Sequence, residues 1–476
     1  MLFSSFTFLF FFLPASLLLY FPLPAALGAL FPRAIGKGGT LLIRNAVLLV
    51  LSLFFYAWGE PVYLLLMLAT TLFNYLIGLL LPRAKHRKAL LCFAVFSDLA
   101  VLFYFKYAPF FLSLLGISLT VPHMPIGISF YTFQAISYVI DVYRGGVRAE
   151  RSLLRFGTYI ALFPQLIAGP IVRYSDVASA LGEREHSVPR AARGARRFAA
   201  GLAKKVVLAN PAGALFQSMV ALPNNSLSAT GAWLALIGFF FQIYFDFSGY
   251  SDMAIGLGEL FGFSFPENFD YPYTARSITD FWRRWHITLS SFFREYVYFP
   301  LGGSRKGKVR TLLNLLAVWS LTGLWHGASW NFILWGIYYF VLLVLEKFLL
   351  CRMLPHLPRV LSHVLTLAAV LFGWLLFAFD GSTDALSLSV LGSFIPALFG
   401  KNGVMWGEDA YHLLRHLPFF AIAALGATPL PRHLYRRLSN GRAGGTISLL
   451  LPLAALVLSL AYLADASFNP FLYFRF

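Results

Sequence analysis

Residues 277–330 hold the densest group of polar and charged side chains in an otherwise apolar chain. They begin with SITDFWRRWHITLS (277–290), continue through PLGGSRKGK (300–308) and end with LTGLWHGASW (321–330). Two histidines, His286 and His326, lie at opposite ends of this stretch, separated by a basic glycine-rich turn and an apolar run. The surrounding chain is long and hydrophobic, which indicates a membrane protein that holds each histidine at a defined depth in the bilayer.

The composition defines the class of protein. The 476 residues are 59% hydrophobic and 12% charged, with a mean hydropathy of +0.71. Soluble proteins are roughly 45–50% apolar and about 25% charged, so the chain is predicted to be a polytopic membrane protein. In such a protein the net charge of +18 reflects loop Lys and Arg that set topology and touch anionic lipid. We therefore expect no nucleic-acid partner.

Apolar segments of about 20 residues predict an all-α fold with about 11–12 membrane spans. The segments cover residues 6–30, 41–58, 62–82, 89–115, 123–143, 201–222, 231–262, 311–327, 329–350, 360–379, 411–429 and 446–465. The first is too long for a signal-peptide core and is expected to be a retained span. Residues 156–172 are shorter and broken by Pro164, Gly169 and Pro170, which favours a re-entrant element.

Alternate loops are rich in Lys and Arg, the positive-inside pattern. This pattern places the N-terminus and the C-terminus outside the cytoplasm. The loops expected on the cytoplasmic side hold Arg33 to Arg44, Arg83 to Lys88, Arg144 to Arg155, Arg184 to Lys205, Arg276 to Arg310, Lys347 to Arg359 and Arg432 to Arg442. The loop at 380–409 is expected outside and carries Asp380, Asp384, Glu408 and Asp409.

This topology separates the two histidines. Around His286, large apolar residues recur at helical spacing with Arg283, Arg284 and Arg294 between them, which predicts one amphipathic helix lying in the cytoplasmic interface. His326 ends an apolar segment and is therefore placed deep, toward the outer half of the bilayer. We expect the pair to mark two levels of one channel.

The environment of each histidine suggests its chemistry. His326 has no Lys or Arg nearby in sequence and is expected to be neutral, so its imidazole can act as a general base. Trp325 and small residues such as Ser329 flank it, and small residues let a ligand approach closely. The structural alternative is a packing histidine bonded to a carbonyl. For His286 the alternative is a polar residue of an amphipathic helix, whereas Arg283 and Arg284 suggest a site mouth for an anionic or phosphate-bearing ligand.

For three other features, the sequence allows either a ligand-binding role or a structural role. Gln242 and Asp246 share a helix face, which either lines a cavity or makes helix-to-helix hydrogen bonds. Arg305 and Lys306 lie in a basic turn that lacks phosphate-loop spacing and favours a reverse turn. The basic stretch at 183–205 favours an interfacial helix over a specific ligand site. Cys92 and Cys351 have no metal or redox spacing, so neither a disulfide nor a metal is expected.

Several motifs resemble the membrane-bound O-acyltransferase family, and within it the bacterial alginate O-acetyltransferase type. They are PIGISFYTFQ (125–134), FPQLIAGPI (163–171), FDFSGYSDMAIG (245–256), FPENFDYPY (265–273) and the stretch at 277–330. The resemblance extends through nearly the whole chain. D-alanyl transfer proteins of Gram-positive walls are similar at fewer segments, and eukaryotic sterol and lipid acyltransferases are more distant.

The resemblance implies a helical fold with a central funnel or tunnel, and active-site histidines at His326, the catalytic one, and at His286. It implies transfer of acetyl from a cytoplasmic donor, acetyl-CoA, with no bound cofactor, in a bacterial inner membrane. A separate esterase-like extracytoplasmic partner is expected to complete transfer onto an exported polysaccharide. The cations Arg283, Arg284, Arg305 and Lys306 are expected to attract donor phosphates, and the loop at 380–409 to dock the partner.

Residues 1–476 are expected to form one integral-membrane acyltransferase domain, with N-terminal spans (1–145), a catalytic core (150–350) and C-terminal spans (360–476). Transfer of another acyl group, such as D-alanine to a cell-wall polymer, is the alternative within the family. A transporter or flippase is the alternative from another class. It would be expected to show structural repeats, and we find none in the sequence.

Overall fold

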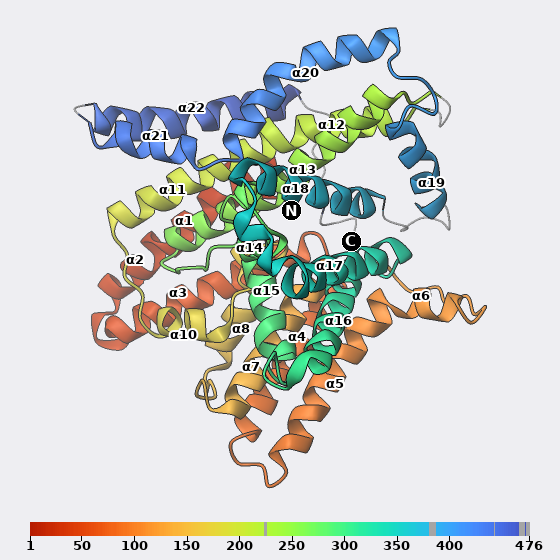
Figure 1. Ribbon diagram of the computed structural model, residues 1–476. Helices are drawn as coiled ribbons and strands as arrows, with labels where there is room; N and C mark the ends of the chain where they lie inside the picture. Colours follow the sequence, from red (N-terminus) through yellow and green to blue (C-terminus); the bar gives the residue numbers. More distant parts are fainter. Residues whose placement is uncertain (223–225, 380–386, 442, 466–471, 473–476) are drawn as a thin grey trace. The chain divides into compact units, whose positions relative to one another are not determined.

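The computed structural model describes residues 1–222, 226–379, 387–441, 443–465 and 472 (Figure 1). These residues form helices and connecting loops, without a strand among them, which confirms the all-α prediction. They divide into two compact units, residues 1–198 with 250–267, and residues 199–249 with 268–476. Each unit joins segments that are far apart in the sequence, and each is described separately.

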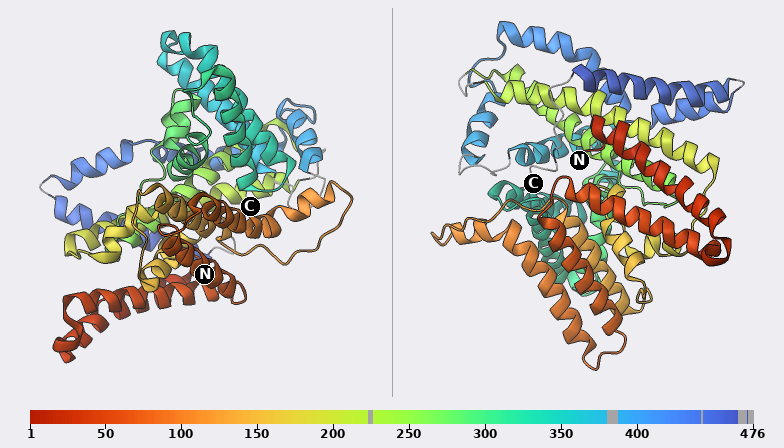
Figure 2. Two further views of the ribbon diagram at one scale, coloured as in Figure 1. Left: turned by 90° about the horizontal axis from the view of Figure 1, so that it is seen from below. Right: turned by 180° about the vertical axis from the view of Figure 1, so that it is seen from behind.

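The first unit packs its helices in two groups. In one group α4, α5 and α7 contact one another side by side, and in the other α1, α2 and α3 pack together (Figure 2). The helices are η1 (Thr7–Phe12), α1 (Leu13–Tyr20), α2 (Pro22–Leu30), α3 (Pro32–Ala57), α4 (Tyr63–Leu80), α5 (Arg87–Lys106), α6 (Ala108–Ser113), α7 (Ile128–Arg144), α8 (Leu153–Ala161), α9 (Phe163–Leu166) and α10 (Tyr174–Gly182). The proline- and glycine-broken segment folds as the short helices α8 and α9 with buried side chains, and neither is a candidate span. That it re-enters the membrane stays a prediction.

Two helices contribute residues to both units. They are α11 (Val188–Ala203) and α13 (Ala229–Leu260).

The second unit holds both histidines. Helix α16 (Gly307–His326) runs beside α17 (Trp330–Phe348), and α17 packs on α18 (Arg359–Ala378) and on the short helix α14 (Ile278–Arg284). The remaining helices are η2 (Lys204–Ala209), α12 (Asn210–Val220), η3 (Pro272–Thr274), α15 (Ile287–Phe293), η4 (Arg294–Tyr298), η5 (Leu350–Arg352), η6 (Leu354–His356), α19 (Ser387–Leu398), α20 (Gly407–Gly426), α21 (Leu430–Ser439) and α22 (Gly444–Asp465).

Eight helices of the described chain are long and apolar enough to cross a membrane, and a bent pair, α20 with α21, makes up to nine. The protein is thus a multi-pass membrane protein, with fewer spans by this measure than the 11–12 expected. The three expected spans outside this set correspond to α7, to η2 with α12, and to α16. Helix α7 is only 17 residues long, η2 begins with two lysines, and α16 carries Lys308, Arg310 and Asn314.

Candidate active site

A close helix pair positions His326. A Cβ atom added at Gly323 of α16 would overlap the carbonyl oxygen of Phe332, and one added at Gly336 of α17 would overlap that of Trp319. The two backbones therefore touch, as small residues permit at helix crossings in membranes. Helix α16 ends at His326, and the link at 327–329 leads directly into α17. The glycine contacts thus fix the place of the histidine.

Aromatic rings surround His326. Its ring centroid lies 4.9 Å from that of Trp325, 5.1 Å from Trp335 and 5.0 Å from Phe377. The side chain is 6% exposed and is therefore buried inside the unit. Its expected depth in the bilayer stays a prediction. That its imidazole acts as a general base stays a prediction.

His286 interrupts the segment that was expected to be one amphipathic helix. That prediction is wrong, because α14 ends at Arg284 and α15 begins at Ile287. His286 has a left-handed backbone (φ 43°, ψ 54°), and side chains such as Phe281, Trp285 and Phe292 are buried. The aromatic residues recur at the spacing of one helix, but some belong to α14 and the others to α15, after the break at His286.

The hydrogen bonds of His286 define its tautomer. Asn268 Oδ1 accepts bonds from the backbone N–H and the hydroxyl of Thr288, at 3.2 and 2.9 Å. This atom also lies 3.2 Å from His286 Nδ1, so Nδ1 must be the donor. Nε2 then carries the lone pair. Burial lowers the pKa of His286 to about 3, so the ring is neutral at pH 7.

Both histidines contact one indole. The Trp325 ring centroid lies 5.7 Å from that of His286 and 4.9 Å from that of His326. The sequence predicted two separate levels of a channel. The structure makes them neighbours across Trp325, which is itself 2% exposed.

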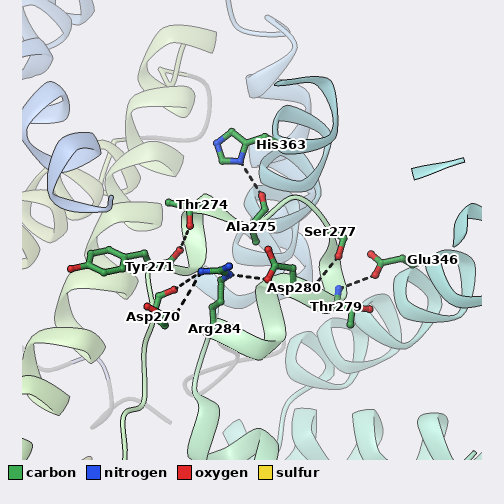
Figure 3. A network of polar contacts seen from close by, with 10 residues as sticks. All are labelled: Asp270, Tyr271, Thr274, Ala275, Ser277, Thr279, Asp280, Arg284, Glu346 and His363. Carbon is green, nitrogen blue, oxygen red and sulfur yellow. Dashed lines mark hydrogen bonds and ion pairs between the residues drawn. The ribbon is translucent and has the colours of Figure 1, made fainter. Parts of the chain in front are cut away.

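Ion pairs brace the segment before His286, and side chains of α17 and α18 hold it in place (Figure 3). From α18, His363 Nδ1 donates to the Ala275 carbonyl at 2.9 Å. Arg284 donates from Nε to Asp280 at 2.8 Å, and its NH1 group lies 3.6 Å from Asp270. The Glu346 carboxylate accepts the backbone N–H groups of Ile278 and Thr279 at 2.6 and 3.1 Å. Arg284 is thus engaged within the protein, whereas Arg283 is exposed.

The remaining candidate residues lie in different surroundings. Asp246, 1% exposed, forms an ion pair with Lys205 at 2.6 Å and accepts the Leu472 N–H at 2.8 Å. Gln242 is buried against Gly213 of α12. These contacts give Asp246 and Gln242 structural roles, and a binding role for them remains a prediction.

Ser329 is closer to the histidine. It precedes α17 and is 7% exposed, and its hydroxyl has no hydrogen-bond partner among the described residues. Arg305 and Lys306 are exposed in a turn, as expected. The Asn314 side chain secures that turn by donating to the Gly303 carbonyl at 2.8 Å.

A cavity of about 190 Å³ opens between α15 and α16. It is mostly apolar, with a few polar side chains. Its walls are Trp282, Leu289, Ser290, Phe293, Arg294, Tyr298, Leu315, Val318, Trp319 and Thr322. Within the described residues, no group of three or more His, Cys, Asp or Glu side chains is arranged to hold a metal ion.

Sequence reasoning missed Asn268, the residue that orients His286. Its signal was present in the motif FPENFDYPY, where an amide stands between a charged residue and an aromatic one. It also missed Trp335 and Phe377, because a tryptophan or phenylalanine in an apolar segment does not show which histidine it contacts.

Comparison with known proteins extends this picture. Residues 146–388, which include both histidines, match the model of the membrane-bound O-acyltransferase family. The chain belongs to this family. It is a membrane-bound O-acyltransferase, so the transporter alternative is not favoured.

Relatives of this O-acyltransferase come from several bacteria. It is 38% identical to a "Probable alginate O-acetylase AlgI" of Pseudomonas putida over the whole of both chains. It is 42% identical to the protein of that name in Pseudomonas syringae, over 84% of this chain and 75% of the relative. A peptidoglycan O-acetyltransferase of Helicobacter pylori is 33% identical over 75% and 74% of the two chains. A teichoic acid D-alanyltransferase of Bacillus subtilis is 28% identical over 60% of this chain.

Proposed function

We propose that this O-acyltransferase moves acetyl groups from acetyl-CoA, on the cytoplasmic side of a bacterial inner membrane, for O-acetylation of an exported polysaccharide. The observation that carries the proposal is the buried pair His286 and His326, joined by Trp325. Relatives named as O-acetylases match at 38–42% identity over most of the chain. The relative named as a D-alanyltransferase matches at 28% over a shorter part, so acetyl is preferred to D-alanine.

The histidines supply acid–base chemistry. His326 takes the proton of a hydroxyl group as that oxygen attacks the thioester carbonyl carbon. The carbon–sulfur bond then breaks, the acetyl ester forms, and the proton passes to the departing thiolate. His286, fixed by Asn268 with its lone pair on Nε2, positions one of the reactants by accepting a hydrogen bond.

Donor and partner contacts are part of the proposal. The exposed side chains Arg283, Arg305 and Lys306 are suited to donor phosphates, and Trp325 and Ser329 to the reacting groups. Arg284 is a weaker candidate because two carboxylates engage it. An extracytoplasmic esterase-like partner and polysaccharide machinery would complete transfer.

The structure describes only part of the acidic loop at 380–409 that was expected to dock a partner. Asp380 and Asp384 lie outside the described residues. Asp409 is buried and accepts bonds from Ser228 and from the backbone N–H of Trp406, both at 2.6 Å. It therefore serves the start of α20 and not an exposed surface, while Glu408 is exposed.

The donor is tested with inverted membrane vesicles that contain the protein and polysaccharide chains. Acetyl-CoA labelled in the acetyl group is added, and label in polymer is counted. We expect label to leave CoA in wild-type vesicles and to remain there in His326→Ala vesicles. If the label stays on CoA in both kinds of vesicle while labelled D-alanine is transferred from its carrier protein, D-alanine and not acetyl is the transferred group.

A further inference from the structure

Two arginines of the first unit pack against one tyrosine. The guanidinium carbons of Arg44, from α3, and Arg184, which follows α10, each lie 5.7 Å from the centre of the Tyr20 ring. Arg184 also lies 4.6 Å from the Phe263 ring. Two like charges are thus held at the same aromatic side chain, in a partly buried place where their repulsion is only weakly screened.

Neither arginine has a carboxylate partner among the described residues. Arg184 donates to the Asn45 side-chain oxygen, but its Nε and NH1 groups, and Nε of Arg44, are buried without an acceptor in the described chain. Burial, with Arg44 as a smaller cause, lowers the pKa of Arg184 to about 10, so it stays cationic at pH 7. Buried cations without a counterion are costly, which indicates that an anion completes this site.

The other polar groups of the cluster also act as donors. The Tyr20 hydroxyl donates to the Phe261 carbonyl at 2.9 Å, so His186 Nε2, 3.2 Å from the same hydroxyl, must be protonated and donate to it. Burial and three arginines lower the pKa of His186 to about 4, so the ring adds no charge. Arg190, one of the three, donates to Ser264 at 2.8 Å.

A cavity of about 300 Å³ adjoins the cluster through Phe21 and His186. Its other walls are Ser187, Val188, Ala191, Glu259 and Leu260. The carboxylate of Glu259 lies 3.9 Å from Nε of Arg193, which offsets its charge. The apolar part of the lining, made by Phe21, Val188, Ala191 and Leu260, suits the apolar chain of a ligand whose anionic head lies at the two arginines.

We propose that Arg44 and Arg184 bind a phosphate ester whose attached chain enters the cavity beside His186. Guanidinium groups suit phosphate because their N–H groups match its oxygens in pairs. Two sources share this chemistry, a membrane phospholipid and a soluble phosphate ester such as CoA. All residues of this cluster belong to the first unit, whereas both candidate active-site histidines belong to the second.

Binding to the full-length protein tests the proposal. Delipidated protein in detergent is titrated with phosphatidylglycerol, with CoA and with inorganic phosphate, and melting temperature is followed. The test variant is R44Q/R184Q, and the matched control is R432Q/R436Q, which removes two exposed arginines from α21. We expect the test variant to bind at least about tenfold more weakly than wild type, and the control to bind like wild type.

The outcomes separate the sources. A shift with phosphatidylglycerol that R44Q/R184Q loses supports a lipid ligand, whereas a shift with CoA or phosphate that it loses supports a soluble ester. An equal shift in R44Q/R184Q and wild type, or no shift with any probe, overturns the site. If R44Q/R184Q does not fold, R44K/R184K keeps both charges but loses the paired geometry, and unchanged binding by that variant would contradict guanidinium recognition. No acyl transfer is measured, so the result does not depend on the proposed function.

Discussion

His286 combines a left-handed backbone with a buried, oriented imidazole. Asparagine tolerates this backbone better than most residues, so His286→Asn removes the ring with little backbone strain. The pKa of His286 falls from an ordinary 6.5 to about 3 on folding. The unfolded chain therefore binds more protons between these values, and the folded state loses stability as pH falls through this window.

Relative to His286→Asn, we expect the free energy of unfolding of the wild-type protein to fall by up to about 1.4 kcal/mol for each pH unit below pH 6.5. The measurement is the melting temperature of both proteins in detergent between pH 4 and 7.5. Parallel pH dependence in the two proteins would mean that the imidazole is not held neutral by burial.

At the same scale, the sequence predicted a site at His286 and His326 from the polar residues around them, and the structure brings both rings against Trp325. Their catalytic roles stay predictions. The sequence did not show how neighbouring charges were engaged. Asp246 and Arg284 looked available for ligands, yet one is paired with Lys205 and the other with Asp280 and Asp270. Asp280 lies one turn before Arg284 on α14, an i, i+4 pair that the spacing could have predicted. Lys205 and Asp270 lie on other segments, so spacing along one helix does not predict those two contacts.

At the scale of elements, the contact between α16 and α17 places His326 and Ser329. Gly323→Ala inserts a methyl group against the Phe332 carbonyl, and such overpacking costs about 1–3 kcal/mol. We expect a lower melting temperature and reduced acyl transfer. The matched control is Gly445→Ala on α22, where an added Cβ meets nothing within 4 Å. If the two variants melt and transfer alike, the helix contact does not position the site.

Sequence patterns predicted most of the helices. They did not predict the break at His286 or the polar residues that lower the hydropathy of α16. Long apolar runs predicted α4, α17 and α18 to within two residues at either end. Helix α3 begins at Pro32, nine residues before its predicted start at 41. The break at His286 was not visible, because the aromatic spacing continues through it. Helix α16 was predicted as a span from its apolar middle, whereas the two charges and Asn314 of its first turns reduce its mean hydropathy.

At the scale of the whole molecule, the positive-inside pattern predicts that α7 crosses the membrane although it is only 17 residues long. We expect Ser118→Cys to react with an impermeant maleimide from outside and Arg148→Cys from the cytoplasmic side. Both positions are exposed, and the native cysteines Cys92 and Cys351 are replaced by serine first. Labelling of both positions from the same side would show that α7 does not cross.

The family and the chemical class followed from the sequence, because the motifs extend through most of the chain. The acceptor polymer does not follow from the sequence, because the relatives of this chain include proteins named for alginate, peptidoglycan and teichoic acid. Neither composition nor motif spacing distinguishes these polymers.

The central claim is that His326 performs the acyl transfer. Its most direct test is the acetyl content of the exported polysaccharide in cells that carry His326→Ala, beside cells with His433→Ala, an exposed histidine of α21. With equal protein in the membrane, we expect His326→Ala to lower acetylation at least about 100-fold and His433→Ala to leave it unchanged. Wild-type acetylation in the His326→Ala cells would contradict the claim.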